Sequence, residues 1–214
     1  MFNGNKILLS GNKQKCLFGF IPGLFVRFKG KNSKVIIHEP IPKFSHTKIR
    51  LGNNCTVEIG SDNKLNWKIQ KLNIKALGDN QKVKIGNAFK LNGANIFLGV
   101  DANTSVEIGE DCMFSSGINI MCTDSHTIYD LSTHEILNKD KSIKIGNHVW
   151  LAEDVTILKG TTIGDNIIIG KNSLVTRDCL DSNSVYAGSP VEKRKQNVNW
   201  SVQNPSKDIK EEVC

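Results

Sequence analysis

The feature of this sequence that most limits its fold is a repeat of six residues. From residue 145 the chain reads IGNHVW, LAEDVT, ILKGTT, IGDNII, IGKNSL and V, so each phrase begins with an aliphatic residue. These residues are Ile145, Leu151, Ile157, Ile163, Ile169 and Val175. The same step recurs upstream at Ile85, Leu91 and Phe97, at Ile108, Phe114 and Ile120, and at Leu51 and Val57. A step of six fits neither a helix nor the alternation of a flat strand.

This step predicts a coil with three flat sides, in which three phrases complete one turn of about eighteen residues. Ile145 then stacks on Ile163, and Leu151 and Ile157 stack in the same way on Ile169 and Val175. Each buried aliphatic side chain contributes roughly 1.5–3 kcal/mol, so such a ladder can hold a solenoid together without helices. Glycine, asparagine and aspartate in the corner phrases, such as GNN, GED and GDN, readily adopt left-handed backbone angles.

The composition favours a single soluble domain. The chain has 214 residues and no Ser/Gly/Pro-rich linker, and it lacks a signal-peptide pattern and any long apolar run that could cross a membrane. Its six cysteines form no C-x-x-C pair, which favours reduced thiols and a cytoplasmic location. The net charge of +7 is spread along the chain without a nucleic-acid-binding motif, so we expect a phosphate-bearing small molecule or an anionic glycan as partner.

After Ile120 the period breaks at a histidine. After Ile120 the next aliphatic position is occupied by His126, and the clear repeat resumes at Ile145. The intervening segment therefore contains an extruded loop, which we place at about residues 127–142. Long loops in compact repeat proteins are often functional.

The repeats resemble those of the hexapeptide-repeat family, left-handed β-helix proteins that are mostly acyltransferases using acetyl-CoA. The resemblance implies an all-β fold, a left-handed parallel β-helix over residues 51–190 that carries the loop. Residues 1–50 are expected to form irregular strands that cap the solenoid, and residues 191–214 a basic C-terminal segment and tail. Solenoids need such caps.

Two phrases, CTDSHT and GNHVWLAEDVTILKG, resemble bacterial capsular polysaccharide O-acetyltransferases, including those that act on polysialic acid. In that group a histidine is the catalytic base and a tryptophan its partner, which implies these roles for His126 and Trp150. An imidazole can remove a hydroxyl proton at neutral pH, and Asp124 or a backbone carbonyl could orient it. The alternatives are a structural histidine at the mouth of a loop and an exposed corner indole that packs at a subunit interface.

The resemblance also implies a binding groove for acetyl-CoA as acyl donor. Ala152 and Gly170 would contribute backbone contacts, Lys171 and Thr176 the groove wall, and Lys193 and Arg194 would bind the cofactor phosphates. The phrase VYAGSPVEKRKQNVNW resembles the end of the family's repeat and the basic segment that follows it. Each basic residue alone could equally be a solvated surface group.

The predicted function is therefore transfer of an acetyl group from acetyl-CoA to a hydroxyl of a sugar or surface polysaccharide. The alternatives are an N-acetyltransferase of an amino sugar or nucleotide sugar and a non-catalytic trimeric scaffold. No metal site is expected, because the histidine pair five residues apart that is found in carbonic anhydrases of this fold is missing. We expect a homotrimer, since closed cyclic symmetry is the rule for homo-oligomers and family members place the base at a subunit boundary.

Overall fold

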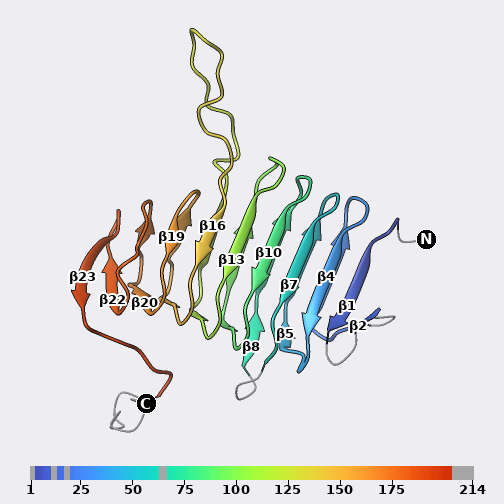
Figure 1. Ribbon diagram of the computed structural model, residues 1–214, viewed down its shortest axis with the longest axis horizontal. Helices are drawn as coiled ribbons and strands as arrows, with labels where there is room; N and C mark the ends of the chain where they lie inside the picture. Colours follow the sequence, from blue (N-terminus) through green and yellow to red (C-terminus); the bar gives the residue numbers. More distant parts are fainter. Residues whose placement is uncertain (1–2, 11–13, 17–19, 63–66, 204–214) are drawn as a thin grey trace.

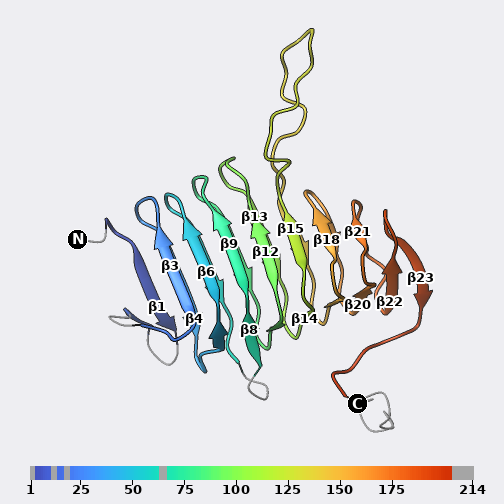
Figure 2. The same ribbon diagram turned by 180° about the vertical axis from the view of Figure 1, so that it is seen from behind.

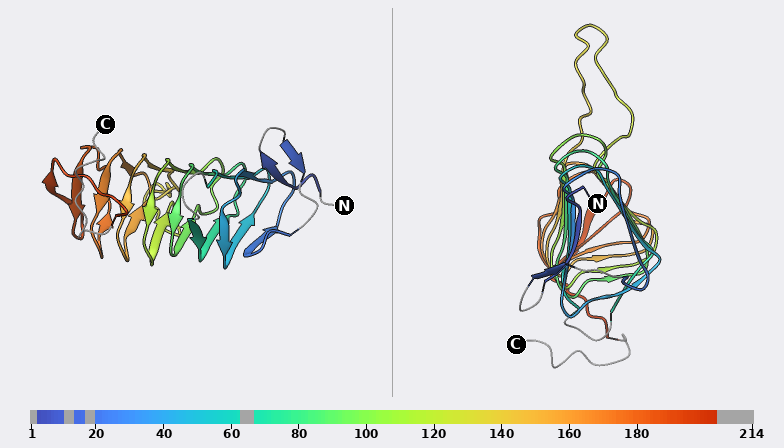
Figure 3. Two further views of the ribbon diagram at one scale, coloured as in Figure 1. Left: turned by 90° about the horizontal axis from the view of Figure 1, so that it is seen from below. Right: turned by 90° about the vertical axis from the view of Figure 1, so that its right-hand side faces the viewer.

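The computed structural model describes residues 3–10, 14–16, 20–62 and 67–203, which form strands and turns but no helix. The strands stack into an elongated prism, with the N-terminal coils at one end and the C-terminal coils at the other (Figure 1 and Figure 2). Seen along its axis, the prism encloses one continuous core, and a single long loop projects from one corner (Figure 3). The aliphatic ladder predicted from the repeat is the reason for this shape.

Three sheets form the sides of the prism. Sheet A contains β1 (Lys6–Ser10), β2 (Gln14–Cys16), β4 (Lys34–His38), β7 (Thr56–Ile59), β10 (Lys82–Ile85), β13 (Ser105–Ile108), β16 (Ile143–Ile145) and β19 (Thr162–Ile163). Sheet B contains β3 (Leu24–Phe28), β6 (Thr47–Leu51), β9 (Leu72–Ala76), β12 (Ala94–Phe97), β15 (Ile118–Met121), β18 (Thr156–Leu158) and β21 (Leu174–Val175). Sheet C contains β5 (Lys43–Ser45), β8 (Lys68–Gln70), β11 (Lys90–Leu91), β14 (Met113–Phe114), β17 (Trp150–Leu151), β20 (Ile167–Ile169), β22 (Ser184–Ala187) and β23 (Glu192–Gln196).

From β4 to β21 the chain visits the sheets in the fixed order A, C, B, and each of these strands pairs in parallel with the equivalent strand of a neighbouring coil. Only the β1–β2 and β22–β23 pairs are antiparallel among the described strands. This arrangement confirms the predicted all-β, left-handed parallel β-helix. We name the three edges of the prism after the sheets that meet there: the A–C, C–B and B–A corners.

The predicted stacking of the last coils is confirmed. Ile145 pairs with Ile163, Leu151 with Ile169 and Ile157 with Val175, and all six side chains are buried. One upstream assignment was wrong by one residue, because Ile96 rather than Phe97 is buried and pairs with Ile120. The corner before β12 is one residue shorter than the strict period requires, so Phe97 points outward.

The backbone at the corners explains why glycine, asparagine and aspartate recur between the aliphatic residues, although not entirely as predicted. Most of the non-glycine residues with positive φ are asparagine or aspartate at corners, for example Asn54 at 53° and Asn166 at 56°. Several glycines that follow an isoleucine do not adopt positive φ. At Gly86 an added Cβ would lie 2.5 Å from the carbonyl oxygen of Gly109, so this glycine is required for close stacking of the coils rather than for a left-handed angle.

Strands also flank the region of clear repeats at both ends. Before residue 51, β3 and β4 already stack in parallel on β6 and β7, with Val35 and Ile37 buried. Strands that alternate buried and exposed residues thus extend the same three sheets without the six-residue signature. At the far end β23 pairs antiparallel with β22, and residues 204–214 of the expected tail lie outside the described residues.

Candidate active site

A long loop projects from the B–A corner before β16 (Figure 1). His126 follows β15 by five residues and lies near the start of this loop. Its side chain is exposed and lines a hollow of about 120 Å³ together with Asp101, Thr123, Asn138 and Asp140, among others. Within the described residues the imidazole ring makes no hydrogen bond. Both ring nitrogens are therefore open to a substrate.

Two polar side chains from the part of the loop that returns to the prism, Asn138 and Asp140, hold the start of the loop in place. The Nδ2 group of Asn138 donates to the backbone oxygen of His126 (2.7 Å), and its Oδ1 accepts from the backbone N–H of Ile128 (2.7 Å). One carboxylate oxygen of Asp140 accepts the backbone N–H groups of Val100 and Asp101, both at 3.0 Å. The histidine thus sits on a braced part of the loop that is tied to the preceding coil.

Asp124, the residue considered as an orienter of His126, has other partners. Its Oδ2 atom accepts hydrogen bonds from Nζ of Lys159 and from Nδ2 of Asn138, the latter at 3.0 Å. These hydrogen bonds hold the pKa of the Asp124 carboxyl below its usual value, and the bond from Lys159 contributes most. Lys159 also donates to the backbone oxygen of Asn138 (2.8 Å). We did not predict Lys159 or Asn138 as parts of the site, although Lys159 lies in the phrase GNHVWLAEDVTILKG and Asn138 in the loop, because sequence alone does not show that both contact Asp124.

Trp150 begins β17 and points away from the core, between Met113 and Ile168 of the neighbouring coils. It is half-buried rather than exposed, because the ring of Trp200 lies against it with the ring centroids 6.2 Å apart. The Nε1–H group of Trp150 is buried and has no hydrogen-bond partner within the described residues. An unpartnered buried donor costs roughly 1–3 kcal/mol, so this N–H is suited to an oxygen that the chain itself does not supply.

Trp200 belongs to the C-terminal segment that returns to the prism after β23. Its ring stacks on His148 at 4.3 Å, and its Nε1–H donates to the backbone oxygen of His148 (3.0 Å). The His148 ring also hydrogen-bonds Asp111 through Nδ1 (2.9 Å) and Asn199 through Nε2 (3.1 Å). We expected a basic C-terminal segment and tail over residues 191–214, without a ring packed on the prism; the single tryptophan in this polar stretch was the signal for a packed segment.

Some of the residues predicted to form the donor groove lie close together at the C–B corner. Ala152 and Gly170 occupy equivalent positions in successive coils. Their backbone N–H groups already donate hydrogen bonds to carbonyl oxygens of the next coil. A bound amide could therefore pair only with the carbonyl oxygens of Ala152 and Gly170. A side chain at Gly170 would approach Ala187 to 2.8 Å, so the corner must stay narrow. Lys171 lies beside them in an ion pair with Glu153 (2.6 Å), which raises the pKa of Lys171 and lowers that of Glu153.

The remaining predicted donor contacts are dispersed. Arg194, on β23, donates through Nε to the backbone oxygen of Ala187 (3.2 Å), which brings it to the same corner as Gly170. Lys193 forms an ion pair with Asp181 (3.0 Å). Thr176 follows β21 at the B–A corner and is thus separated from Ala152 and Gly170 by the width of sheet B. A single chain therefore assembles only part of the predicted groove.

In the part of the chain that the structure describes, no group of three or more His, Cys, Asp or Glu side chains is placed to hold a metal ion. The same residues include no helix that is long and apolar enough to cross a membrane.

The sequence pattern of the bacterial transferase hexapeptide family, with six repeats, matches residues 142–177. This match covers the coils from β16 to β21, where the six-residue period is clearest, and it agrees with the observed fold. Among curated proteins, the polysialic acid O-acetyltransferase of Neisseria meningitidis is 36% identical over 129 residues, which are 51% of this chain and 58% of that protein. The galactoside O-acetyltransferase of Escherichia coli K12 is 36% identical over 107 residues, 46% of this chain and 52% of that protein. The chain spans about half the length of these curated relatives.

Two solved structures are similar over nearly the whole chain. The polySia-specific acetyltransferase NeuO has a TM-score of 0.71 at 28% identity and covers 97% of this chain and 89% of its own. The polysialic acid O-acetyltransferase OatWY has a TM-score of 0.67 at 26% identity and covers 98% of this chain and 93% of its own. The likeness therefore includes the N-terminal coils and the C-terminal segment as well as the repeats.

Proposed function

We propose that this protein is an O-acetyltransferase that transfers the acetyl group of acetyl-CoA to a hydroxyl of a sugar or surface polysaccharide. The observation that carries the proposal is the exposed, unbonded imidazole of His126 on a braced loop base, in a fold similar over 97% of the chain to a polySia-specific acetyltransferase. Residues 51–190 form the proposed catalytic unit, with 1–50 and 191–214 as its flanking segments. Buried free thiols at Cys55, Cys112, Cys122 and Cys179 suit a cytoplasmic location.

His126 is the proposed general base. It would take the proton of the acceptor hydroxyl as the oxygen attacks the thioester carbon, and then return that proton to the departing thiolate. One residue can thus serve both steps, and no covalent acyl-enzyme is needed. Such proton transfer typically contributes about 10²–10⁴-fold to the rate.

Trp150 is the proposed hydrogen-bond donor. An indole N–H can donate but cannot accept a proton, so it cannot act as a base. Its unpartnered Nε1–H could bind an oxygen of the acceptor sugar, or the oxygen on which charge develops during transfer. A bound oxygen would satisfy this buried donor, which destabilises the protein while it has no partner.

The donor is proposed to lie along the C–B corner of the last coils. The small residues Ala152 and Gly170 leave backbone carbonyl groups accessible to the amides of an extended pantetheine arm. Lys171, Lys193 and Arg194 supply positive charge for phosphates, and each already pairs with one carboxylate, namely Glu153, Asp181 and Glu192. These exposed ion pairs are individually weak, so a phosphate can compete for the cations. Thr176 would line the wall that the neighbouring subunit completes.

A homotrimer would complete the site. His126 and Trp150 lie at different corners of one chain, so they can act on one acceptor only if they come from adjacent subunits. The loop offers a surface for such an assembly: Ile128, Tyr129, Leu131, Ile136 and Leu137 are large apolar side chains that are at least half exposed, and Leu131 is 84% exposed. An apolar arm of this kind is typical of a protein interface.

Polysialic acid is the proposed acceptor among the possible glycans, because relatives similar over nearly the whole chain carry that name and the chain is basic. The test is a thiol-release assay with acetyl-CoA and a panel of polysialic acid, neutral capsule sugars and amino sugars. Mild base should remove the transferred acetyl group from the product, since an ester hydrolyses whereas an amide does not. Absence of thiol release with every acceptor would refute the proposal.

A further inference from the structure

The outer face of sheet C carries three lysines in register on successive coils. Lys43 pairs with Lys68, and the pairing of Leu91 with Ile69 places Lys90 next in the same row. The row continues through Met113 to Trp150. With coils spaced by about 4.8 Å, the row runs for roughly 19 Å from Lys43 to the proposed catalytic tryptophan.

A second row of basic residues lies on sheet B. Arg27 pairs with Arg50, and Arg50 pairs with Lys75. This row continues through Phe97 to Met121, the last residue of β15, and the loop that carries His126 begins directly after it. The row on sheet C therefore leads to Trp150, and the row on sheet B leads to the loop that carries His126.

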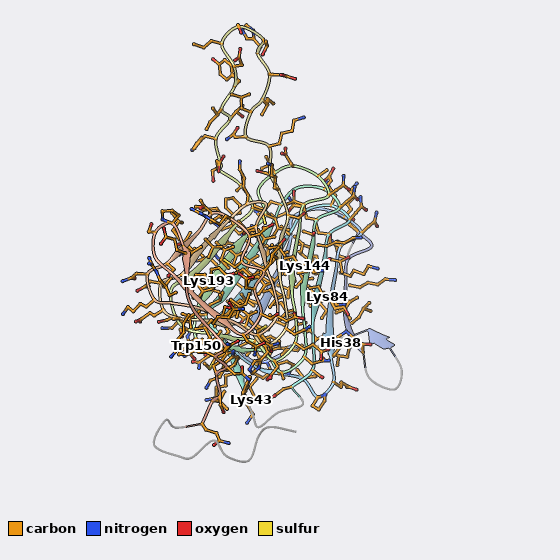
Figure 4. The ribbon with its side chains drawn as sticks, turned by 60° about the vertical axis from the view of Figure 1, so that its left-hand side comes forward. His38, Lys43, Lys84, Lys144, Trp150 and Lys193 are labelled. Carbon is orange, nitrogen blue, oxygen red and sulfur yellow. The ribbon has the colours of Figure 1, made fainter. Side chains whose placement is uncertain are left out.

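Sheet A shows that such rows are not a general property of this prism. There, the outward residues of successive coils alternate in sign: Glu58 pairs with Lys84, Lys84 with Glu107, and Glu107 with Lys144. Figure 4 shows Lys84 and Lys144 together on that side, away from Trp150 and Lys43. In this row each charge has a complementary neighbour, whereas the rows on sheets B and C place like charges side by side. Elsewhere on sheet A, Lys6 pairs with Lys34.

Like charges in register on adjacent strands repel each other. None of the six basic side chains forms an ion pair with a described residue; Lys75 and Lys90 instead lie over the rings of Phe97 (5.2 Å) and Trp67 (5.7 Å). The fold thus keeps two unneutralised rows that an anionic ligand would stabilise.

The basic row on sheet C begins in a surface hollow. Lys43 and Lys68 line a hollow of about 640 Å³, together with Ser45 and Gln70 and with apolar side chains that include Phe20 and Ile41. This volume lies in the range of ligand-binding clefts. Apolar surface, hydroxyl and amide groups and cations in one hollow suit the mixed surface of an acidic sugar.

Uncharged polar side chains accompany both rows. On sheet B, Asn73, Asn95 and Asn119 form a ladder of side-chain hydrogen bonds of 3.2 Å beside the basic row. On sheet C, Ser45 pairs with Gln70. Amide and hydroxyl groups next to cations match a polymer that presents both hydroxyls and carboxylates, which favours a polysaccharide over a nucleic acid.

We infer that the two rows form a binding track for a linear polysaccharide with carboxylate-bearing sugar units, and that they guide it to His126 and Trp150. The inference rests on the proposed function, because only a trimer that joins His126 of one subunit to Trp150 of the next places the two rows on one groove. The rows occupy the N-terminal coils, whereas the proposed donor groups occupy the C-terminal coils. Acceptor and donor therefore approach the transfer site from opposite ends of the prism.

The test compares three triple variants with equal loss of charge. One neutralises the row on sheet C (Lys43→Gln, Lys68→Gln, Lys90→Gln), one the row on sheet B (Arg27→Gln, Arg50→Gln, Lys75→Gln), and the control removes lysines from sheet A (Lys34→Gln, Lys82→Gln, Lys84→Gln). Binding of polysialic acid is measured by calorimetry without acetyl-CoA. Each row variant should bind at least tenfold more weakly than wild type, the control should bind like wild type, and the salt dependence should weaken in the row variants only.

Activity separates this inference from the proposed function. The row variants should raise KM for polysialic acid while KM for acetyl-CoA and thiol release with a short acceptor stay unchanged. If wild type transfers acetyl groups and the row variants keep the wild-type KM for polysialic acid, the track is wrong and the function stands. If wild type releases no thiol with any acceptor, the function itself fails. Equal affinity of wild type for single-stranded DNA would overturn the assignment to a polysaccharide. Should a triple variant misfold, Lys68→Gln and Arg50→Gln alone provide the comparison.

Discussion

His126 and Trp150 lie beyond opposite ends of strand β16 within one chain. The loop that carries His126 leads into β16, and Trp150 follows β16 after the A–C corner. In Figure 4 the loop rises from the top of the prism, whereas Trp150 lies in its lower part. The two residues proposed to act together are thus kept apart by the fold of the subunit, and the assembly must bring them together.

Replacing His126 by alanine should reduce kcat by about 10²–10⁴-fold, because the acceptor hydroxyl loses its base. Binding of acetyl-CoA, measured by calorimetry, should remain near wild type, since the proposed donor contacts lie on other coils. His134→Ala is the matched control: His134 lies on the same loop and stacks on Tyr129, but it has no assigned role in the chemistry. A folded His126→Ala enzyme with full activity would show that the histidine only opens the loop.

Leu131→Asp should weaken the trimer, because it places a charge in the centre of the apolar arm. Sedimentation velocity at micromolar concentration should show a shift toward monomer, with activity falling in parallel. Leu180→Asp serves as control, since Leu180 is also exposed, at 61%, but lies on the body of the prism. If wild type itself sediments as a fully active monomer, the proposed shared site is wrong.

Ile163→Asp should destabilise the fold by more than about 3 kcal/mol, because a carboxylate would be buried in the aliphatic ladder. Ile163 is 1% exposed and pairs with Ile145. Thr162→Asp on the same strand points outward next to Lys144 and should be tolerated. Urea unfolding monitored by circular dichroism measures the difference; equal stability of the two variants would contradict the register.

Trp200→Ala should destabilise the protein by about 3 kcal/mol, because it removes a buried ring and its stacking on His148. It should also expose Trp150. In a Trp67→Phe background, the remaining emission of Trp150 should shift to longer wavelength. Val202→Ala, at a half-exposed position of the same segment, should change neither property. An unshifted emission maximum would mean that Trp200 does not cover Trp150.

The buried thiols predict a loss of stability in alkali. Burial raises the pKa of Cys112 and of Cys122 to about 12, from an ordinary value of 9.0. The folded state therefore holds these protons more tightly, and the resulting stabilisation is present below pH 9 and is lost as pH rises toward 12. Iodoacetamide at pH 8 should label both cysteines only after unfolding. Cys112→Ala should reduce the dependence of the urea midpoint on pH above 9; an unchanged dependence would refute this cause.

The sequence by itself determined the architecture of this protein. A six-residue period of aliphatic residues can be buried only in a three-sided coil, so the pairing of Ile145 with Ile163 was predictable, and the break at His126 located the loop. Before residue 51 local sequence predicted irregular capping strands, but not that they extend the same three sheets, because strands there bury alternate residues and lack the period. It also misplaced Phe97, since corner lengths vary by one residue.

Only the tertiary structure decided which residues meet across coils. The bonds from Lys159 to Asp124, and from Trp200 to His148, join residues 35 and 52 positions apart. The basic rows on sheets B and C likewise consist of residues separated by whole coils. The physical reason is that a coil length, including its irregular corners, sets which outward side chains share a row. The period fixes the buried positions wherever corner lengths are regular, because burial of apolar surface is non-directional, whereas hydrogen bonds and charge rows depend on exact register.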